Sequence, residues 1–243
     1  MIELSLILPC YNEGPNVDRA VQEAFETAKE VASAFEIVVV DDGSADDTAD
    51  RARALQKTIP ELVLVQHPVN RGYGAALRTG FRAARFPWVF YTDGDAQFDS
   101  RQLCDVVDQV QEGAVLAGYR SPRQDHSVLR TGLGRAWTFL ANASLGLAVA
   151  DVNCAFKVFP KALLDAIPME SQGAAIDAEI LAEARHRGLP IRQVPVAHRP
   201  RVAGRATGAR ADVMLLAVWE LARVARRLAR QPQTRLRPVR LAS

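Results

Sequence analysis

Short apolar runs alternate with amphipathic stretches through the first half of the chain. The apolar runs predict buried strands at residues 4–8, 36–40, 62–66, 88–92 and 114–119. Between them, apolar residues recur at helical spacing over 16–34, 46–57, 73–85 and 100–112. A strand followed by a helix, repeated in this way, is typical of a mostly parallel sheet with helices on both faces. We therefore expect an α/β fold.

Polar or glycine-rich segments follow four of the predicted strands. These segments are residues 9–13, 41–44, 70–74 and 93–97. The carboxyl ends of parallel strands meet at one edge of a sheet, and ligands of open α/β sheets bind at that edge. Turn chemistry alone does not explain four such segments, so we expect a ligand site there.

The last of these segments, which reads DGDAQFD from 93 to 99, has the composition of a cation site. If the chain stays extended, Asp93, Asp95 and Gln97 project to the same side. Carboxylate and amide oxygens suit Mg²⁺ or Mn²⁺, and Mg²⁺ usually takes one or two protein carboxylates and completes its shell with water and substrate phosphates. The alternative interpretation is an acidic turn that closes a strand. Asp99 is expected to cap the helix that follows.

Composition narrows the class of protein. The chain has 243 residues, of which 49% are apolar and 24% charged, which is ordinary for a globular domain with a sizeable core. Three scattered cysteines (Cys10, Cys104 and Cys154) are too few for a disulfide framework or a zinc site, so we expect a reducing compartment. No apolar run has the length of a membrane span, and the first residues lack the features of a signal peptide.

Positive charge is concentrated at the C-terminal end. The whole chain has a net charge of +2, but residues 201–243 alone carry ten arginines and two acidic residues, a net of +8. Residues 209–230 show apolar positions at helical spacing, with arginines in the last turns. Two interpretations stay open: a helix docked on the domain with a solvated charged face, or a helix on an anionic membrane surface, for which Trp219 beside clustered arginine is typical. Nucleic-acid binding is not expected, because aromatic residues interleaved for base stacking are absent from this segment.

The polar segments, taken in order, resemble the signature of family 2 glycosyltransferases with the Rossmann-like GT-A fold. The matching pieces are PCYNE at 9–13, VVVDDGS at 38–44, NRGYGA at 70–75 and DGDAQ at 93–97. Further matches are GYR at 118–120, Arg130, DVNCAFK at 151–157 and HRPRVAG at 198–204. The likeness is strongest to the branch that contains dolichol- and polyprenyl-phosphate sugar synthases. It suggests one domain over residues 1–208, followed by a basic amphipathic helix and tail over 209–243.

The resemblance implies a nucleotide-sugar donor and a divalent cation, Mg²⁺ or Mn²⁺. The donor-binding residues that it implies are Pro9, Tyr11, Glu13, Asp42, Gly72 and Asp93. Of these, the first three would line the base and ribose pocket, and Asp42 would accept hydrogen bonds from the base. The implied cation ligands are Asp93, Asp95 and Gln97, with Asp95 also counted as catalytic. For the glycines at 72 and 74, a simple strand-to-helix turn and a close approach to the nucleotide are equally open.

The resemblance also bears on the acceptor. Arg120 and Arg130 match arginines that grip an acceptor phosphate, and arginine suits bidentate phosphate recognition. Asp151 and Asp177 are candidate catalytic carboxylates. Their alternative roles are a cap of a strand, with Lys157 in a salt bridge, and a favourable acid at the start of a helix. A general base is needed for a hydroxyl acceptor but not for a phosphate that is already ionised.

We expect a metal-dependent inverting glycosyltransferase that moves a hexose from a nucleotide sugar to a polyprenyl or dolichyl phosphate. It would be cytoplasmic and peripheral at the inner face of the membrane, with GDP-mannose as the first choice of donor and UDP-glucose as the second. The alternatives are a saccharide or other hydroxyl acceptor, and a membrane-surface protein that binds nucleotide sugar without catalysis. The latter rests on residues 205–208, which stand where family members carry Ser-Lys. An oxidoreductase is disfavoured, because no G-x-G-x-x-G motif follows the first strand.

Overall fold

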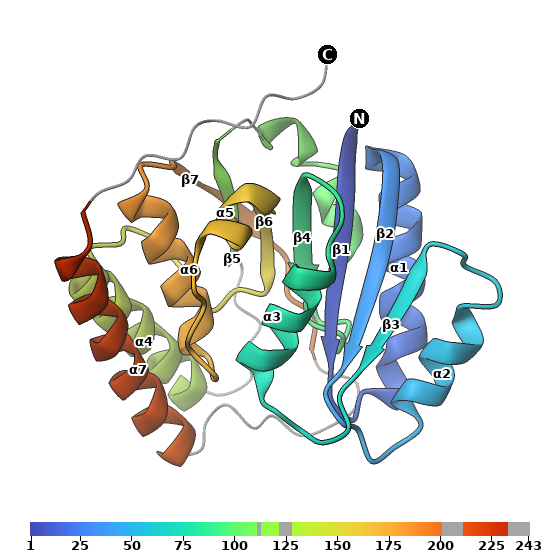
Figure 1. Cartoon of the computed structure of the whole chain (residues 1–243), viewed down its shortest axis with the longest axis horizontal. Helices are drawn as coiled ribbons and strands as arrows, with labels where there is room; N and C mark the ends of the chain where they lie inside the picture. Colours follow the sequence, from blue (N-terminus) through green and yellow to red (C-terminus); the bar gives the residue numbers. More distant parts are fainter. Residues whose placement is uncertain (111–112, 122–127, 201–210, 233–243) are drawn as a thin grey trace.

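A twisted, mostly parallel sheet with helices on both faces forms the body of the protein (Figure 1). The structure is a computed structural model that describes residues 1–110, 113–121, 128–200 and 211–232. The elements in chain order are β1 (Ile2–Cys10), α1 (Gly14–Val31), β2 (Ala32–Asp41), α2 (Thr48–Leu55), β3 (Leu62–Gln66), α3 (Tyr73–Ala83), β4 (Trp88–Thr92), the 3₁₀ turns η1 (Ser100–Leu103) and η2 (Val107–Gln109), β5 (Val115–Arg120), α4 (Val128–Leu145), β6 (Phe156–Pro160), α5 (Lys161–Ala166), α6 (Ala175–His186), β7 (Ile191–Val196) and α7 (Ala211–Arg230).

The strand order places the ends of most strands at one edge. Within the described ranges the sheet has seven strands in the order β3-β2-β1-β4-β6-β5-β7. β6 runs antiparallel to both of its neighbours, β4 and β5, whereas the other pairs are parallel. Thr92 at the end of β4 pairs with Phe156 at the start of β6. The carboxyl ends of the parallel strands and the beginning of β6 therefore share one edge.

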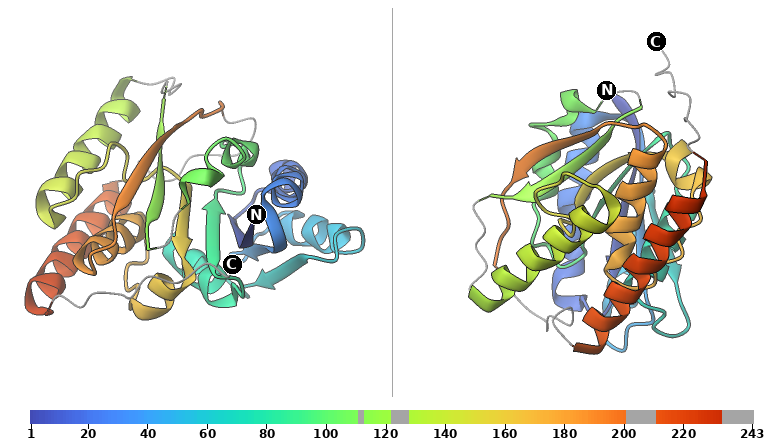
Figure 2. Two further views of the ribbon diagram at one scale, coloured as in Figure 1. Left: turned by 90° about the horizontal axis from the view of Figure 1, so that it is seen from above. Right: turned by 90° about the vertical axis from the view of Figure 1, so that its left-hand side faces the viewer.

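The central strands are continuous apolar runs because helices cover both of their faces. Every residue of β4 is buried, as are residues 4–10 of β1 and 36–41 of β2. α1 packs on β1 and β2, and α3 packs on the same two strands from the opposite face. This follows from the strand order, because β2 and β3 are added on one side of β1 and β4 on the other, and the crossovers are right-handed. α4, α6 and α7 gather at the β7 end of the sheet (Figures 1 and 2). The predicted mostly parallel α/β fold is confirmed.

The predicted boundaries hold best where the apolar run is bounded by turns. The strands expected at 62–66 and 88–92 match β3 and β4 residue for residue, and the other three differ at their ends. The helix expected over 100–112 is wrong. Short i to i+3 bonds close there instead, such as Cys104 N to Arg101 O at 2.9 Å and Gln109 N to Val106 O at 2.9 Å. The β-branched pair Val106 and Val107 disfavours a regular helix, and only single turns form.

Asp99 caps the first of these turns, as expected. Its carboxylate accepts a hydrogen bond from the backbone N–H of Arg101 at 3.1 Å. The hydrogen bonds from Arg101 and the charges of Arg199 and Arg101 hold the pKa of Asp99 below its usual value, although burial acts in the opposite direction and is the largest single influence. The cap therefore remains an anion at neutral pH.

α7 docks on the rest of the protein through one of its faces. Ala217, Glu220, Leu221 and Val224 on this face are buried against α6 and α4. Arg227 reaches the carboxylates of Glu179 and Glu183 on α6 at 2.8 and 2.9 Å. The segment therefore adopts the docked position that was one of its two interpretations. The predicted boundary at residue 208 lies outside the described residues.

The docking includes two acidic side chains that solvent does not reach. The side chains of Glu179 and Glu183 are 0% exposed. Burial alone would raise the pKa of Glu179, but backbone N–H groups of Glu170 and Ser171 and the guanidinium of Arg227 lower it overall. An ionised carboxylate in this position depends on its donors, so α7 contributes directly to the stability of α6.

Replacing Arg227 with alanine should therefore destabilise the whole protein. The change removes the cation beside two buried carboxylates, and we expect a loss of about 3 kcal/mol in the free energy of unfolding. Chemical denaturation at pH 7 measures it. Arg226 lies on the same turn but is exposed, so Arg226→Ala is the matched control and should change stability by less than about 0.5 kcal/mol. Equal stability of the two variants would contradict the docking role.

Candidate active site

The loop after β1 is tied to the loop after β2. The backbone N–H of Asn12 donates to Ser44 Oγ at 2.8 Å, and that of Glu13 donates to Thr48 Oγ1 at 2.9 Å. Asn12 has a φ of 55°, in the left-handed region that asparagine tolerates. Tyr11 is 45% exposed, whereas Glu13 is only 9% exposed. An aromatic ring open to solvent next to a sheltered carboxylate is an arrangement that can take a base and a ribose.

The two aspartates that end β2 have different surroundings. Asp41 caps the next turn by accepting the N–H of Ser44 at 3.1 Å. Asp42 is 3% exposed and accepts the backbone N–H groups of Arg71 and Gly72, both at 2.9 Å. The imidazole Nδ1 of His67 lies 2.6 Å from the same carboxylate. Asp42 thus holds the 70–74 loop in place, and its contact with a base stays a prediction.

The 70–74 loop rests on the segment before α6. Gly74 N donates to Gln172 O at 2.7 Å, and a Cβ at Gly74 would lie 2.4 Å from Ser171 O. Gly72 has a φ of +91°, which favours glycine. Both glycines are therefore required by the fold itself, whatever else the loop contacts.

The DGDAQ segment forms a tight turn and not the extended chain that its spacing suggested. β4 stops at Thr92, and Ala96 has a φ of 54°. Asp95 Oδ1 accepts the N–H of Gln97 at 3.1 Å, which closes the turn. The expectation that the three polar side chains share a side through extended geometry is therefore wrong. All three residues instead belong to one turn.

Contacts with β1 explain why this segment turns. Gly94 N donates to Pro9 O at 3.2 Å. A Cβ on Gly94 would lie 2.3 Å from Cys10 Sγ and 3.0 Å from Pro9 O. The absence of a side chain lets the segment approach the end of β1, so the first and fourth polar segments meet at Pro9 and Gly94.

The donor set of the turn fits a hard divalent cation. Asp93 is partly exposed, and Asp95 and Gln97 are each 6% exposed. Gln97 Nε2 donates to the carbonyl of Arg199 at 3.0 Å, so the amide oxygen is the atom left for a cation. In the part of the chain that the structure describes, no group of three or more His, Cys, Asp or Glu side chains is placed so that it could hold a metal ion. Water or substrate phosphate would therefore complete the coordination shell, as is usual for Mg²⁺.

Two tyrosines contact acids near this edge, one in the turn and one in a buried ion pair. The hydroxyl of Tyr73 donates to Asp93 Oδ1 at 3.0 Å, and that of Tyr91 donates to Asp177. Lys157 Nζ lies 2.9 Å from the same oxygen of Asp177, and the side chains of this pair are 0% and 3% exposed. Burial, and then the charges of the neighbouring aspartates, raise the pKa of both phenols well above its usual value. Both tyrosines are therefore donors at neutral pH.

Arg120 and Asp151 form the second ion pair of the edge. Arg120 Nε lies 2.7 Å from Asp151 Oδ2, and Nη2 lies 3.0 Å from Oδ1. Their side chains are 13% and 5% exposed. The two residues come from the end of β5 and the segment before β6, which the antiparallel direction of β6 brings together. The side chain of Arg130, on α4, lies outside the described residues.

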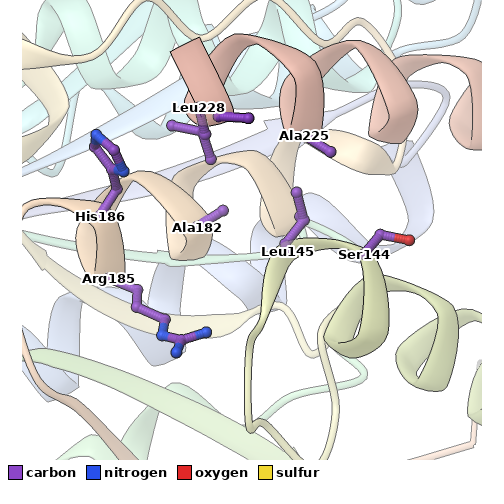
Figure 3. A pocket seen from close by; sticks show the side chains of 8 residues that line it. Ser144, Leu145, Ala182, Arg185, His186, Ala225 and Leu228 are labelled. Atoms are coloured by element: carbon purple, nitrogen blue, oxygen red, sulfur yellow. The ribbon is translucent and has the colours of Figure 1, made fainter. Parts of the chain in front are cut away.

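A separate cavity of about 300 Å³ lies between α4, α6 and α7 (Figure 3). Leu145, Ala182 and Leu228 supply apolar walls, and Arg185 and His186 supply polar ones. None of the residues assigned to the donor, the cation or the acceptor lines it. The candidate site is therefore the edge of the sheet and not this cavity.

The sequence analysis missed the two tyrosines and recognised Lys157 only as a partner in a salt bridge. Tyr73 lies within the NRGYGA piece, and Tyr91 lies within the strand before DGDAQ. The sequence does not indicate that Tyr73 contacts Asp93 or that Tyr91 contacts Asp177, because each contact joins two different elements. The salt bridge considered for Lys157 is present, with Asp177 as its partner.

Comparison with known proteins agrees with this arrangement. The family model described as Glycosyl transferase family 2 matches residues 5–167. A dolichyl-phosphate beta-glucosyltransferase of Trichomonas vaginalis is 28% identical over 80% of the chain. An undecaprenyl-phosphate 4-deoxy-4-formamido-L-arabinose transferase of Pseudomonas aeruginosa is 30% identical over 83% of it. The chain spans 65% and 59% of the length of these two relatives, respectively.

A solved structure shares the fold. The mannosyltransferase PcManGT from Pyrobaculum calidifontis, in complex with GDP-Man and Mn²⁺, superposes with a TM-score of 0.66 at 23% identity. The match covers 90% of this chain and 64% of that one. At this identity the likeness concerns the fold, which is that of the GT-A glycosyltransferases.

The contact between Gly94 and Cys10 generates a test of the turn. Gly94→Ala should cost about 1–3 kcal/mol of stability, because its Cβ collides with Cys10 Sγ. Adding Cys10→Ala removes the sulfur and should restore most of the loss, although Pro9 O stays close. Denaturation of the two single variants and the double variant measures the coupling. If the two changes simply add, the sulfur is not what requires glycine here.

Proposed function

Because the chain belongs to glycosyl transferase family 2, we propose that it moves a hexose from a nucleotide sugar to a polyprenyl phosphate. The observation that carries this proposal is that three features meet at one edge of the sheet. They are the turn that contains Asp95, the loop after β1 that contains Tyr11, and the bidentate ion pair of Arg120 with Asp151. The relatives named for dolichyl-phosphate and undecaprenyl-phosphate acceptors support the acceptor class.

The donor would lie along the ends of β1, β2 and β4. Tyr11 and Glu13 would take the nucleoside, and Gly72 would allow its close approach. GDP-mannose is the leading candidate and UDP-glucose the second. The complex of PcManGT with GDP-Man supports the first, and the beta-glucosyltransferase relative supports glucose as the sugar. The two donors differ in base and sugar, so a direct comparison is needed.

Asp93, Asp95 and Gln97 would hold Mg²⁺ or Mn²⁺. When bound, such a cation supplies charge neutralisation for the diphosphate leaving group. The chain's own contribution is to keep two carboxylates and one amide oxygen on a single turn. The hydrogen bonds of Gln97 to Arg199 and of Tyr73 to Asp93 limit the freedom of that turn.

The state of the carboxylates supports a phosphate acceptor over a hydroxyl. Asp151 is paired with Arg120, and Asp177 is paired with Lys157. A general base must reach the proton that it removes, and both carboxylates are nearly buried and engaged by cations. An ionised phosphate needs no base. Asp151 then serves to hold the guanidinium of Arg120 in the plane that suits phosphate.

The reaction balances without a proton transfer. An oxygen of the acceptor phosphate attacks the anomeric carbon of the hexose and forms a new C–O bond. The bond between that carbon and the donor's diphosphate oxygen breaks, and the electron pair leaves with the nucleoside diphosphate. The attack comes from the face opposite the leaving group, so the configuration inverts.

The outer face of α7 would bind the membrane surface at its inner, cytoplasmic side. Leu215 is 73% exposed, Trp219 57% and Val218 45%, and Phe139 on the neighbouring α4 is 75% exposed. A helix with apolar side chains outward and arginines close by suits an anionic lipid surface. None of the helices in the described ranges is long and apolar enough to cross a bilayer.

A transfer assay with matched acceptors tests the reaction. We expect the protein with Mn²⁺ to glycosylate a polyprenyl phosphate and not the corresponding polyprenol, from GDP-mannose or UDP-glucose. Asp95→Asn should lower the rate about a hundredfold or more, because loss of a cation ligand costs several kcal/mol of charge stabilisation. Asp50→Asn, at an exposed position on α2, is the control. Undiminished transfer by Asp95→Asn would refute the cation assignment, and transfer to a saccharide hydroxyl alone would refute the acceptor.

Vesicle binding tests the surface of α7. Leu215→Glu should weaken binding to vesicles rich in phosphatidylglycerol about tenfold or more, since burial of a leucine is worth about 1.5–3 kcal/mol and the new carboxylate is repelled. Co-sedimentation measures the bound fraction. Ala54→Glu adds the same charge at an exposed position of α2, far from α7, and should have a much smaller effect. Equal loss in both variants would show that only net charge matters.

A further inference from the structure

Tyr73 reaches the cation-type turn from a different element. Tyr73 opens α3, and its hydroxyl donates a 3.0 Å hydrogen bond to Oδ1 of Asp93, which follows β4. We propose that Tyr73 is a positioning residue, which holds one carboxylate oxygen of Asp93 and so presents the other to the divalent cation. This inference rests on the proposed function in one respect, that Asp93 takes part in binding the cation.

The backbone on both sides of Tyr73 is restrained. On one side, the N–H groups of Arg71 and Gly72 donate to Asp42, each at 2.9 Å. On the other side, Gly74 N donates to Gln172 O at 2.7 Å. These bonds fix the backbone position from which the phenol extends, and the hydrogen bond to Asp93 holds its far end.

The restraint extends to α7. Glu220 of α7 is 1% exposed, and its Oε1 accepts the N–H of Gln172 at 2.6 Å. Arg78 of α3 donates to the carbonyls of Ser171 and Met169, the latter at 3.1 Å. Residues 169–172, on which Gly74 rests, are therefore hydrogen-bonded to both α3 and α7.

A donor that holds a ligating carboxylate acts on cation affinity. Rotation of an unheld carboxylate must be frozen when a cation binds, and a hydrogen bond formed beforehand removes part of that cost. Loss of such an outer partner typically lowers metal affinity about 10-fold to 100-fold. A tyrosine that served only the packing of α3 would leave cation affinity unchanged once the protein is folded.

Tyr73→Phe removes the hydroxyl and keeps the ring. Titration of Mn²⁺ in the presence of GDP or UDP, followed by the electron paramagnetic resonance signal of free Mn²⁺, should show about tenfold weaker binding than in the unchanged protein. In turnover, the Mn²⁺ concentration for half-maximal rate should rise by the same factor, and kcat should recover at saturating Mn²⁺. The melting temperature without metal should stay close to that of the unchanged protein. Tyr119→Phe, at the end of β5, is the matched control and should bind Mn²⁺ normally.

A double-mutant cycle with Asp93→Asn keeps the test independent of a general effect on folding. If Tyr73 acts through Asp93, the loss of Mn²⁺ affinity in the double variant should be smaller than the product of the two single losses. Mn²⁺ affinity of Tyr73→Phe within twofold of the unchanged protein, or independent effects in the cycle, would overturn the positioning role and leave the proposed function intact. Failure of the unchanged protein to bind Mn²⁺ with any nucleotide would overturn both.

Discussion

β6 runs against the strands on either side of it, and this direction decides what reaches the carboxyl edge of the sheet. A parallel strand between β4 and β5 would place its beginning at the far edge, away from the ends of its neighbours. Because β6 is antiparallel, the segment that leads into it lies beside Thr92 and Arg120. Asp151 can then pair with Arg120, and Lys157 can reach Asp177. Both ion pairs of the edge therefore depend on this one reversed strand.

The acidic side chains at the two ends of this edge have different kinds of partner. On the side proposed for the donor, Asp42 accepts two backbone N–H groups and Asp93 accepts the phenol of Tyr73. On the side proposed for the acceptor, Asp151 is paired with Arg120 and Asp177 with Lys157. The first arrangement suits a metal ion, and the second suits a phosphate that brings its own negative charge. The division of the site into two chemistries thus follows from how its acids are satisfied.

The sequence located β3 and β4 better than β6 and β7 for a physical reason. β4 is buried throughout and β3 is a short apolar run at the end of the sheet, so both were located from the pattern alone, and the rule for strand ends located the ligand edge. β7 alternates with exposed residues and contains Pro195, and β6 carries Lys157 near its start and ends at Pro160, so neither gave a clear pattern. The turn at Ala96 and the contacts of Tyr73 depend on residues from other elements. Long-range packing of this kind, such as Gly94 on Cys10, leaves no local periodicity to detect.

Glu220 gives the terminal helix a role beyond coverage of the core. Its carboxylate binds the amide of Gln172, whose carbonyl binds the amide of Gly74, so α7 and the 70–74 loop are two neighbours of one short segment. Coupling between two binding events is reciprocal in free energy. A ligand that binds the 70–74 loop more tightly when α7 holds this segment would therefore strengthen the contact between α7 and the segment by the same factor.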